Sequence, residues 1–260
     1  MASQSTPAPT LDVLLTLRLT LALWWREFVP ITLLGFAFIT LPALVARVAV
    51  PADPGPGIST IVFTAQAVLG MVFAASISFS GIAALIGRRF DPRRFMLLGL
   101  GASQPGLVTA LTLGAGLVTV GIVLVLSRNF GQAGGFLAFA ALAIALWSVA
   151  TLLPAIPAAV VEELTPVRAL ERAAGLTHGN RWRLAALVLF VATALMVITG
   201  GLTVLLFGEN ADAKTMRRIA DAMTLTDPGL WIALLSNVLI FGVLACLPPA
   251  VYTSLALKKR

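Results

Sequence analysis

Side chains that could do chemistry gather in one stretch of this sequence, between Glu162 and Arg183. It contains the only histidine, His178, so a histidine-rich metal site is excluded and a Ser–His–Asp triad would have to use this residue. His178 stands between Thr177 and Gly179, a polar setting typical of a solvated position near lipid headgroups. A glycine-rich phosphate-binding loop is not present, because no glycine in the sequence is followed directly by Lys-Ser or Lys-Thr. We therefore expect no catalytic residue, no metal and no cofactor, and we expect that the protein is not an enzyme.

The acidic pair Glu162 and Glu163 is interpreted as part of a structural clamp. It ends one apolar segment and precedes a short helix. The start of that helix is marked by Thr165, a residue type that caps free N–H groups, and by Pro166, which needs no N–H partner. Arginines can pair with the carboxylates and hold the helix against the apolar segment. The predicted clamp consists of Glu162, Glu163, Thr165, Pro166, Arg168 and Arg172, with Arg181 and Arg183 as alternative partners.

The helix that begins at Pro166 is expected to be amphipathic. One face holds Val167, Leu170 and Ala174, and the other holds Arg168, Glu171, Arg172 and Gly175. Tryptophan favours the headgroup level, and each basic residue near an anionic surface contributes about 1 kcal/mol. We therefore expect two basic clusters to contact anionic headgroups on the cytoplasmic face or a partner protein. The candidate residues are Arg88, Arg89, Arg93, Arg94, Arg181, Trp182 and Arg183.

The two clusters also share a pattern. Phe90-Asp91-Pro92 matches Leu164-Thr165-Pro166, because each has an apolar residue, a capping residue and a proline. The pattern predicts a repeated unit of one interfacial helix, one outward span and one returning span. Residues 11–27 would supply a third copy. The alternation from Leu15 to Leu23 is typical of a strand, but an unpaired strand edge near a membrane is costly, so we favour a helix.

Composition places these motifs at a membrane. Of the 260 residues, 59% are hydrophobic and 11% are charged, and the mean hydropathy is +0.99, whereas a soluble domain carries about 25% charged residues. The net charge of +7 indicates basic loops that face anionic lipid. Nucleic acid is not an expected partner, because no basic stripe with interleaved aromatic residues is present. The single cysteine, Cys246, leaves no intramolecular disulfide.

Apolar segments long enough to cross the hydrocarbon core occur at six places. They are 28–49, 59–87, 105–127, 136–161, 184–207 and 229–257. Residues 1–10 are small and polar, and we expect a disordered tail there, followed by a single membrane domain over 11–260. The predicted fold is an all-α integral membrane protein, a six-span helical bundle with amphipathic helices at the cytoplasmic interface.

The distribution of basic residues predicts the orientation of these spans. If the N-terminus is cytoplasmic, only Arg47, Arg128, Lys214, Arg217 and Arg218 of the 18 Lys and Arg residues lie outside. Cytoplasmic loops are enriched in Lys and Arg, and six spans return the chain to its starting side. Both termini are therefore predicted to be cytoplasmic, in a multi-pass protein of a bacterial inner membrane.

Proline and polar residues interrupt several spans. Helix breaks are predicted at Pro154, Pro157, Pro248 and Pro249; such breaks line some transporter sites but are more often packing kinks. Gly70, Ala74 and Ser78 recur at every fourth residue and allow close helix contact, within the chain or in a dimer. No span has a charge near its middle, and we expect the polar residues to hydrogen-bond between helices. These are Gln66, Ser76, Ser78, Ser80, Gln104, Ser236 and Asn237.

The stretch that follows residue 160 resembles a family motif. The matching residues are Val160-Val161-Glu162, Pro166, Ala169-Leu170, Arg172, Leu176-Thr177, Gly179-Asn180 and Trp182-Arg183. They resemble a broad, mostly uncharacterised family of prokaryotic membrane proteins that includes the membrane domain fused to some glycerophosphodiester phosphodiesterases. The resemblance implies six spans. Members often have Ser-Trp where this chain has Ala173-Ala174, and basic residues where it has Gly175 and His178. The chain contains no phosphodiesterase domain, so that activity is not carried over.

The sequence leaves three functions open. The leading hypothesis is a non-enzymatic scaffold or accessory subunit that binds lipid, a membrane protein partner or a second copy of itself. The alternative is a transporter or lipid translocator that uses the proline-broken spans 136–161 and 229–257, and a membrane-embedded lipid enzyme comes third. A lumen lined by Gln66, Asn237 and both proline breaks would favour transport. A tightly packed interior with lipid in outer grooves would favour the scaffold.

Cysteine labelling tests the predicted orientation. In a background with Cys246→Ala, a Thr215→Cys variant is expected to react with a membrane-impermeant maleimide added to intact cells, because residue 215 lies in the outer loop. A Phe90→Cys variant is expected to stay unlabelled until the membrane is opened. Labelling at position 90 and protection at position 215 would reverse the topology.

Overall fold

The protein is all-helical in the part that the computed structural model describes, residues 10–50, 56–87, 131–208, 219 and 223–256. Five helical stretches are long and apolar enough to cross a membrane: Phe28–Ala49, Thr64–Leu85, Gly134–Val161, Arg181–Phe207 and Pro228–Ala256. The predicted span 105–127, residues 1–9 of the tail, Gln104, and Arg88, Arg89, Arg93 and Arg94 lie outside the described residues. The all-helical fold is thus confirmed for the described residues, where five of the six predicted spans correspond to helices long and apolar enough to cross a membrane.

The helices follow the predicted order. They are α1 (Val13–Arg26), α2 (Phe28–Gly35), the π-helical segment η1 (Phe36–Thr40), α3 (Leu41–Ala49), α4 (Pro56–Leu85), α7 (Gly131–Leu152), α8 (Ala155–Val161), α9 (Pro166–Thr177), α10 (Arg181–Phe207) and α12 (Pro228–Ala256). A helix satisfies its backbone groups within its own segment, which the membrane interior requires. Apolar length therefore sets these boundaries, and the predicted spans in this part lie within a few residues of the observed ends.

Helix α1 shows why its alternating leucines do not make a strand. Asp12 caps the helix, because its carboxylate accepts a hydrogen bond from the backbone N–H of Leu15 at 3.0 Å. The buried residues of α1 are Thr16, Thr20 and Leu23, a helical spacing. The Thr20 hydroxyl donates to the carbonyl of Thr16 at 2.9 Å, so the buried threonines need no partner strand. The helix predicted for residues 11–27 is confirmed.

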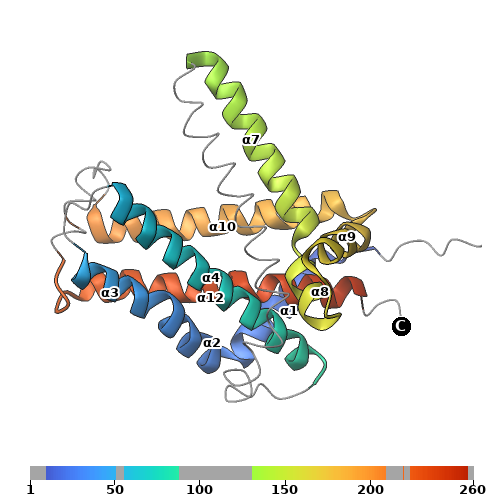
Figure 1. Cartoon of the computed structure of the whole chain (residues 1–260), viewed down its shortest axis with the longest axis horizontal. Coiled ribbons are helices and arrows are strands. Elements are labelled where there is room, and N and C mark those ends of the chain that lie inside the picture. The colour runs from blue at the N-terminus through green and yellow to red at the C-terminus, as the bar shows by residue number, and fades with distance from the viewer. Residues whose placement is uncertain (1–9, 51–55, 88–130, 209–218, 220–222, 257–260) are drawn as a thin grey trace, which may run out of the picture.

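Helix α12 is the element against which most others pack: α1, α2, η1, α4, α8 and α9 all contact it (Figure 1). Glycines on two neighbouring helices allow this close approach. A Cβ atom added at Gly35 of α2 would lie 2.7 Å from Cγ1 of Val238, and one at Gly81 of α4 would lie 3.2 Å from Cγ of Pro249. Both contacts would be tighter than ordinary packing distances, so the helices can lie this close only because glycine has no side chain.

The serines of α4 do not join helices as expected. Ser76, Ser78 and Ser80 are buried, and their hydroxyl groups donate to the carbonyl oxygens of Val72, Ala74 and Ser76 in the same helix. The carbonyl four residues earlier lies within reach of any helical serine, so these hydroxyls find acceptors without a neighbouring helix. The prediction of hydrogen bonds between helices is wrong for these three residues.

The two ends of the molecule differ in packing. Where α8 and α9 meet the last turns of α12, Leu184, Val251 and Leu255 are completely or almost completely buried. Far from this end, Phe136 of α7 and Leu205 of α10 are 80% and 74% exposed. Helix α7 projects away from the other long helices (Figure 1). Large apolar side chains with this exposure are expected of a surface covered by lipid.

Proline affects two of the spans differently. Helix α7 ends at Leu152 and α8 begins after Pro154, while Pro157 lies buried inside α8. Helix α12 instead continues through Pro248 and Pro249. The predicted break at Pro154 is therefore present, whereas the break predicted in the last span is wrong. Neighbouring helices hold α12 in shape at the site where the two prolines remove backbone donors.

Gly35 is expected not to tolerate a single added methyl group. Gly35→Ala would press Cβ against Val238 and lower the free energy of unfolding by about 1–3 kcal/mol, the usual effect of overpacking. Gly200→Ala is the matched control, because nothing lies within 4 Å of a Cβ atom there. The measurement is the melting temperature of the purified protein in detergent. Equal values for the two variants would contradict the packing argument, and Val238→Ala should restore the stability of the Gly35→Ala variant.

Candidate functional site

One carboxylate, that of Glu162, joins three helices at the tightly packed end of the molecule. Glu162 is the C-cap residue of α8. Its two oxygens accept hydrogen bonds from Nε of Arg172 in α9, both at 3.0 Å, and Oε1 also accepts one from the Tyr252 hydroxyl in α12 at 2.8 Å. The Glu162 and Arg172 side chains remain 27% and 46% exposed, so solvent screens their attraction. The pair fixes geometry more than it adds stability.

The other predicted clamp residues surround this pair. Glu163 is exposed and has a φ of 50°, a left-handed conformation that turns the chain between α8 and α9. Thr165 precedes α9, but its hydroxyl makes no capping hydrogen bond, which contradicts the prediction; the exposed hydroxyl can bond water instead. Pro166 is the first residue of α9, as predicted. Arg168 is exposed on the same helix.

The buried face of α9 is not the one predicted. Val167 is 66% exposed, whereas Ala169 and Ala173 are fully buried together with Thr177. The Thr177 hydroxyl donates to the carbonyl of Thr151 in α7 at 3.2 Å. Both faces have helical periodicity, so apolar pattern alone does not choose between them. The alanine face is the buried one because its small side chains allow α9 to lie close to α8 and α7.

The turn between α9 and α10 holds the start of the first helix. The side-chain oxygen of Asn180 accepts a hydrogen bond from the backbone N–H of Leu11 at 2.7 Å. Nη1 of Arg183 donates to the Leu11 carbonyl at 2.9 Å. Asn180 is only 3% exposed, so this contact is sealed from solvent. We call Leu11, Asn180 and Arg183 the latch. Asn180 has no predicted role beyond the family motif, because its hydrogen-bond partner lies 169 residues away in the chain.

The predicted lipid-contact residues of this turn take different positions. Trp182 is 77% exposed and packs edge-on against Trp147 of α7, with ring centroids 5.0 Å apart. Arg183 belongs to the latch. Arg181 is half-buried, and its Nε atom has no hydrogen-bond partner within the described part of the chain. Of the three, the Trp182 ring is the group most available to lipid.

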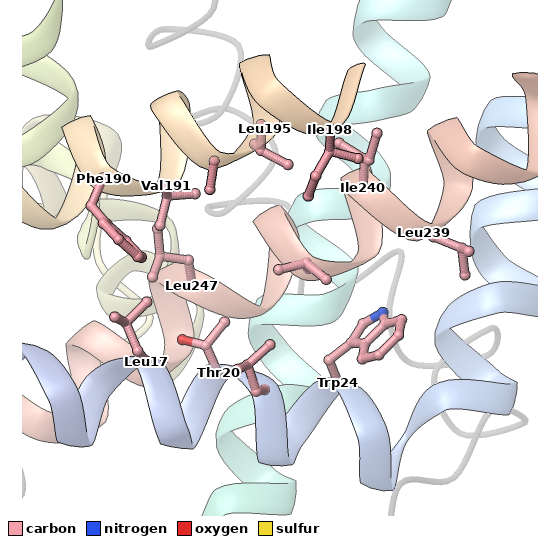
Figure 2. A pocket seen from close by; sticks show the side chains of 13 residues that line it. Leu17, Thr20, Trp24, Phe190, Val191, Leu195, Ile198, Leu239, Ile240 and Leu247 are labelled. Carbon is pink, nitrogen blue, oxygen red and sulfur yellow. The ribbon is translucent and has the colours of Figure 1, made fainter. Parts of the chain in front are cut away.

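A groove of about 350 Å³ runs between α1, α10 and α12 (Figure 2). Leu17 and Trp24 line it from α1, Phe190 and Ile198 from α10, and Leu247 from α12. Apart from the indole N–H of Trp24, the polar group among its described lining residues is the hydroxyl of Thr20, which already donates within α1. This apolar groove therefore offers mainly shape and dispersion contacts.

A second groove, of about 590 Å³, lies on another side of α12, against η1, α3 and α4. Two carboxamides, from Gln66 and Asn237, line it together with Pro248. Pro154 is not among its lining residues, so the structure brings together only part of the lumen that would favour transport. We call this second site the amide groove.

The remaining titratable groups do not gather into a reaction centre. Across the described residues, no three or more His, Cys, Asp or Glu side chains lie together in a group that could hold a metal ion. Cys246 is buried in α12, and His178 is exposed at the end of α9. The best-connected carboxylate, Glu162, is occupied by Arg172 and Tyr252. This arrangement supports helix docking better than proton transfer or nucleophilic attack.

Removing the latch amide is expected to free the N-terminal helix. Asn180→Ala leaves the buried N–H of Leu11 without its acceptor, which costs about 1–3 kcal/mol. Limited proteolysis in detergent should then cut before α1 faster than in the wild type, and the melting temperature should fall. Arg168→Ala, at an exposed position of α9, is the control. A protease pattern for Asn180→Ala identical to that of the control would show that the latch does not hold α1.

No family model, no curated protein and no solved structure matches this chain. The resemblance to the six-span family stays a prediction.

Proposed function

We propose that the protein is a non-enzymatic membrane scaffold that binds lipid along its outer surface, in a bacterial inner membrane with both termini in the cytoplasm. The apolar groove between α1, α10 and α12 is the observation that carries this proposal. It opens along helices whose outward side chains are already apolar and exposed, and it offers no group that could act on a substrate. A site of this kind retains a lipid chain without reacting with it.

The distribution of burial supports the placement in the bilayer. The end of the molecule that contains the latch and Glu162 is closed by side chains of the protein, while the long helices expose their apolar side chains away from it. Lipid would cover the exposed part, and the packed end would project toward the cytoplasm. Trp25 and Arg26, exposed at the end of α1, provide an aromatic and a basic side chain for the headgroup level.

The charged groups of the packed end serve to position helices. Glu162 connects α8, α9 and α12, and Arg183 holds the backbone at Leu11. These contacts use the charges that a transport or catalytic site would need. A rigid inner end with lipid-facing helices is the architecture expected of an accessory subunit that organises lipid or a partner protein.

Chemistry favours a lipid chain as the occupant of the apolar groove. The exposed Arg18 lies between Leu17 and Leu21, which both line the groove, so a basic side chain stands beside it. An anionic lipid would place its chains in the groove and its headgroup near Arg18, where charge attraction contributes about 1 kcal/mol.

Filling the groove tests this function. Leu195→Trp is expected to lower the amount of anionic lipid that co-purifies with the protein by about one molecule per chain, because one small groove holds one ligand. Leu205→Trp, on the same helix but outside the groove, is the control. The readout is quantitative mass spectrometry of lipids and proteins retained in mild detergent. Unchanged anionic lipid in Leu195→Trp, or no enrichment of anionic lipid in the wild type, would refute the proposal.

A transporter is the second candidate, and one observation favours it. Gln66, Asn237 and Pro248 line the same groove, so hydrogen-bonding groups and a proline of α12 border one cavity. Transport would require this groove to open alternately to both sides of the membrane.

A further inference from the structure

The amide groove combines hydrogen-bonding groups with a membrane setting, and this combination defines a ligand. Gln66 and Asn237 both line the groove and are both exposed. Gln66 is the third residue of the candidate span Thr64–Leu85, and Asn237 is the tenth residue of the candidate span Pro228–Ala256. If both helices cross the bilayer, the Asn237 carboxamide lies within the hydrocarbon region and the Gln66 carboxamide lies near its edge.

A carboxamide in hydrocarbon needs a partner. Within the described residues, neither Gln66 nor Asn237 makes a hydrogen bond to the protein. An amide transferred from water to an apolar medium without a hydrogen bond costs roughly 2–7 kcal/mol. Each group therefore gains from any bound molecule that supplies a donor or an acceptor.

The carboxamides themselves decide which polar group fits. Each has N–H donors and an oxygen acceptor. The Leu244 carbonyl, whose usual helical partner is missing at Pro248, lies seven residues beyond Asn237, about 10 Å along α12, and is too far away for the same small group to bond it. A ligand with one small polar group therefore fits best when that group both donates and accepts a hydrogen bond.

The rest of the lining limits the ligand further. Among the described residues that line the groove none is charged, so a phosphate or carboxylate would find no cation in this part of the chain. Phe38, Met71 and Phe241 present apolar surface, and a Cβ atom at Gly70 would meet nothing within 4 Å. The groove thus favours an uncharged molecule with a long apolar body and a small polar group.

We propose that the amide groove binds an uncharged, membrane-soluble alcohol. Its hydroxyl oxygen accepts a hydrogen bond from the amide N–H of Asn237 or Gln66, its hydroxyl hydrogen is donated to a carboxamide oxygen, and its apolar body lies against Phe241 and Met71. This site goes beyond the proposed scaffold function, because it is separate from the apolar groove and takes a different chemical class of ligand.

Three molecules with one tail test the polar requirement. Geranylgeraniol, geranylgeranyl acetate and geranylgeranyl phosphate are titrated against the wild-type protein in detergent, and bound ligand is counted by native mass spectrometry. The alcohol is expected to bind about fivefold or more tightly than the acetate, which cannot donate a hydrogen bond, and the phosphate is expected to bind weakly because of its charge. Equal affinity for alcohol and acetate would overturn the proposal without any variant.

Near-isosteric substitutions then locate the site. Asn237→Leu and Gln66→Met keep side-chain size but remove the amide, and each is expected to weaken binding of the alcohol about fivefold and to weaken binding of the acetate less, because the acetate only accepts hydrogen bonds and so loses fewer of them. Leu195→Trp, which fills the other groove, should leave alcohol binding unchanged, so this site and the proposed scaffold function can fail independently. Alcohol binding that persists in the double amide variant would overturn the proposal. So would a wild-type dimer that Asn237→Leu converts to monomer, because a second copy would then be the occupant.

Discussion

Close contact of neighbouring helices with α12 is the interaction on which the rest of the structure depends. Lipid tails are as apolar as leucine, so burial of apolar surface does not by itself drive membrane helices together, and van der Waals fit must do so. The fit comes from glycines on three helices. Val238 packs against Gly35, and Pro249 packs against Gly81. Ile31 and Trp24 pack against Gly242 of α12 itself. These contacts set the positions of α1, α2 and α4, and with them the walls of both grooves.

At the packed end, polar contacts decide how the helices that start or stop there are connected. The latch fixes Leu11 against the turn before α10, and the Thr16 hydroxyl lies 3.4 Å from that of Ser254 in α12. Helix α1 is thus docked along α12 rather than lying free on a membrane surface. Glu162 performs the same task for α8 and α9. Groups that looked like candidates for chemistry are held by neighbouring helices.

The sequence predicted what depends on local pattern. Five helical stretches long and apolar enough to cross a membrane appear where the sequence predicts spans, α1 is helical, Pro166 begins α9, and Pro154 separates α7 from α8. These features follow from the backbone's need for internal hydrogen bonds and from the geometry of proline.

What the sequence could not predict depends on a partner elsewhere in the chain. The buried face of α9 is the one where Ala169 and Ala173 leave room for neighbouring helices. The hydrophobicity of the residues does not predict this difference in size. The Asn180 contact joins residues from opposite halves of the chain, and no spacing rule connects them. The serines of α4 were expected to bind across helices, but the nearer carbonyl acceptors of their own helix were sufficient.

The two grooves show how one helix can present two different surfaces. Helix α10 packs chiefly against α7, and this leaves the apolar groove open between α10, α1 and α12. Around α12, Leu239 and Val243 face that groove while Asn237 and Leu244 face the amide groove, so a shift of one or two residues changes the exposed chemistry from purely apolar to hydrogen-bonding. Because glycine contacts fix the rotation of α12, the same packing that holds the molecule together also decides which side chains each groove receives.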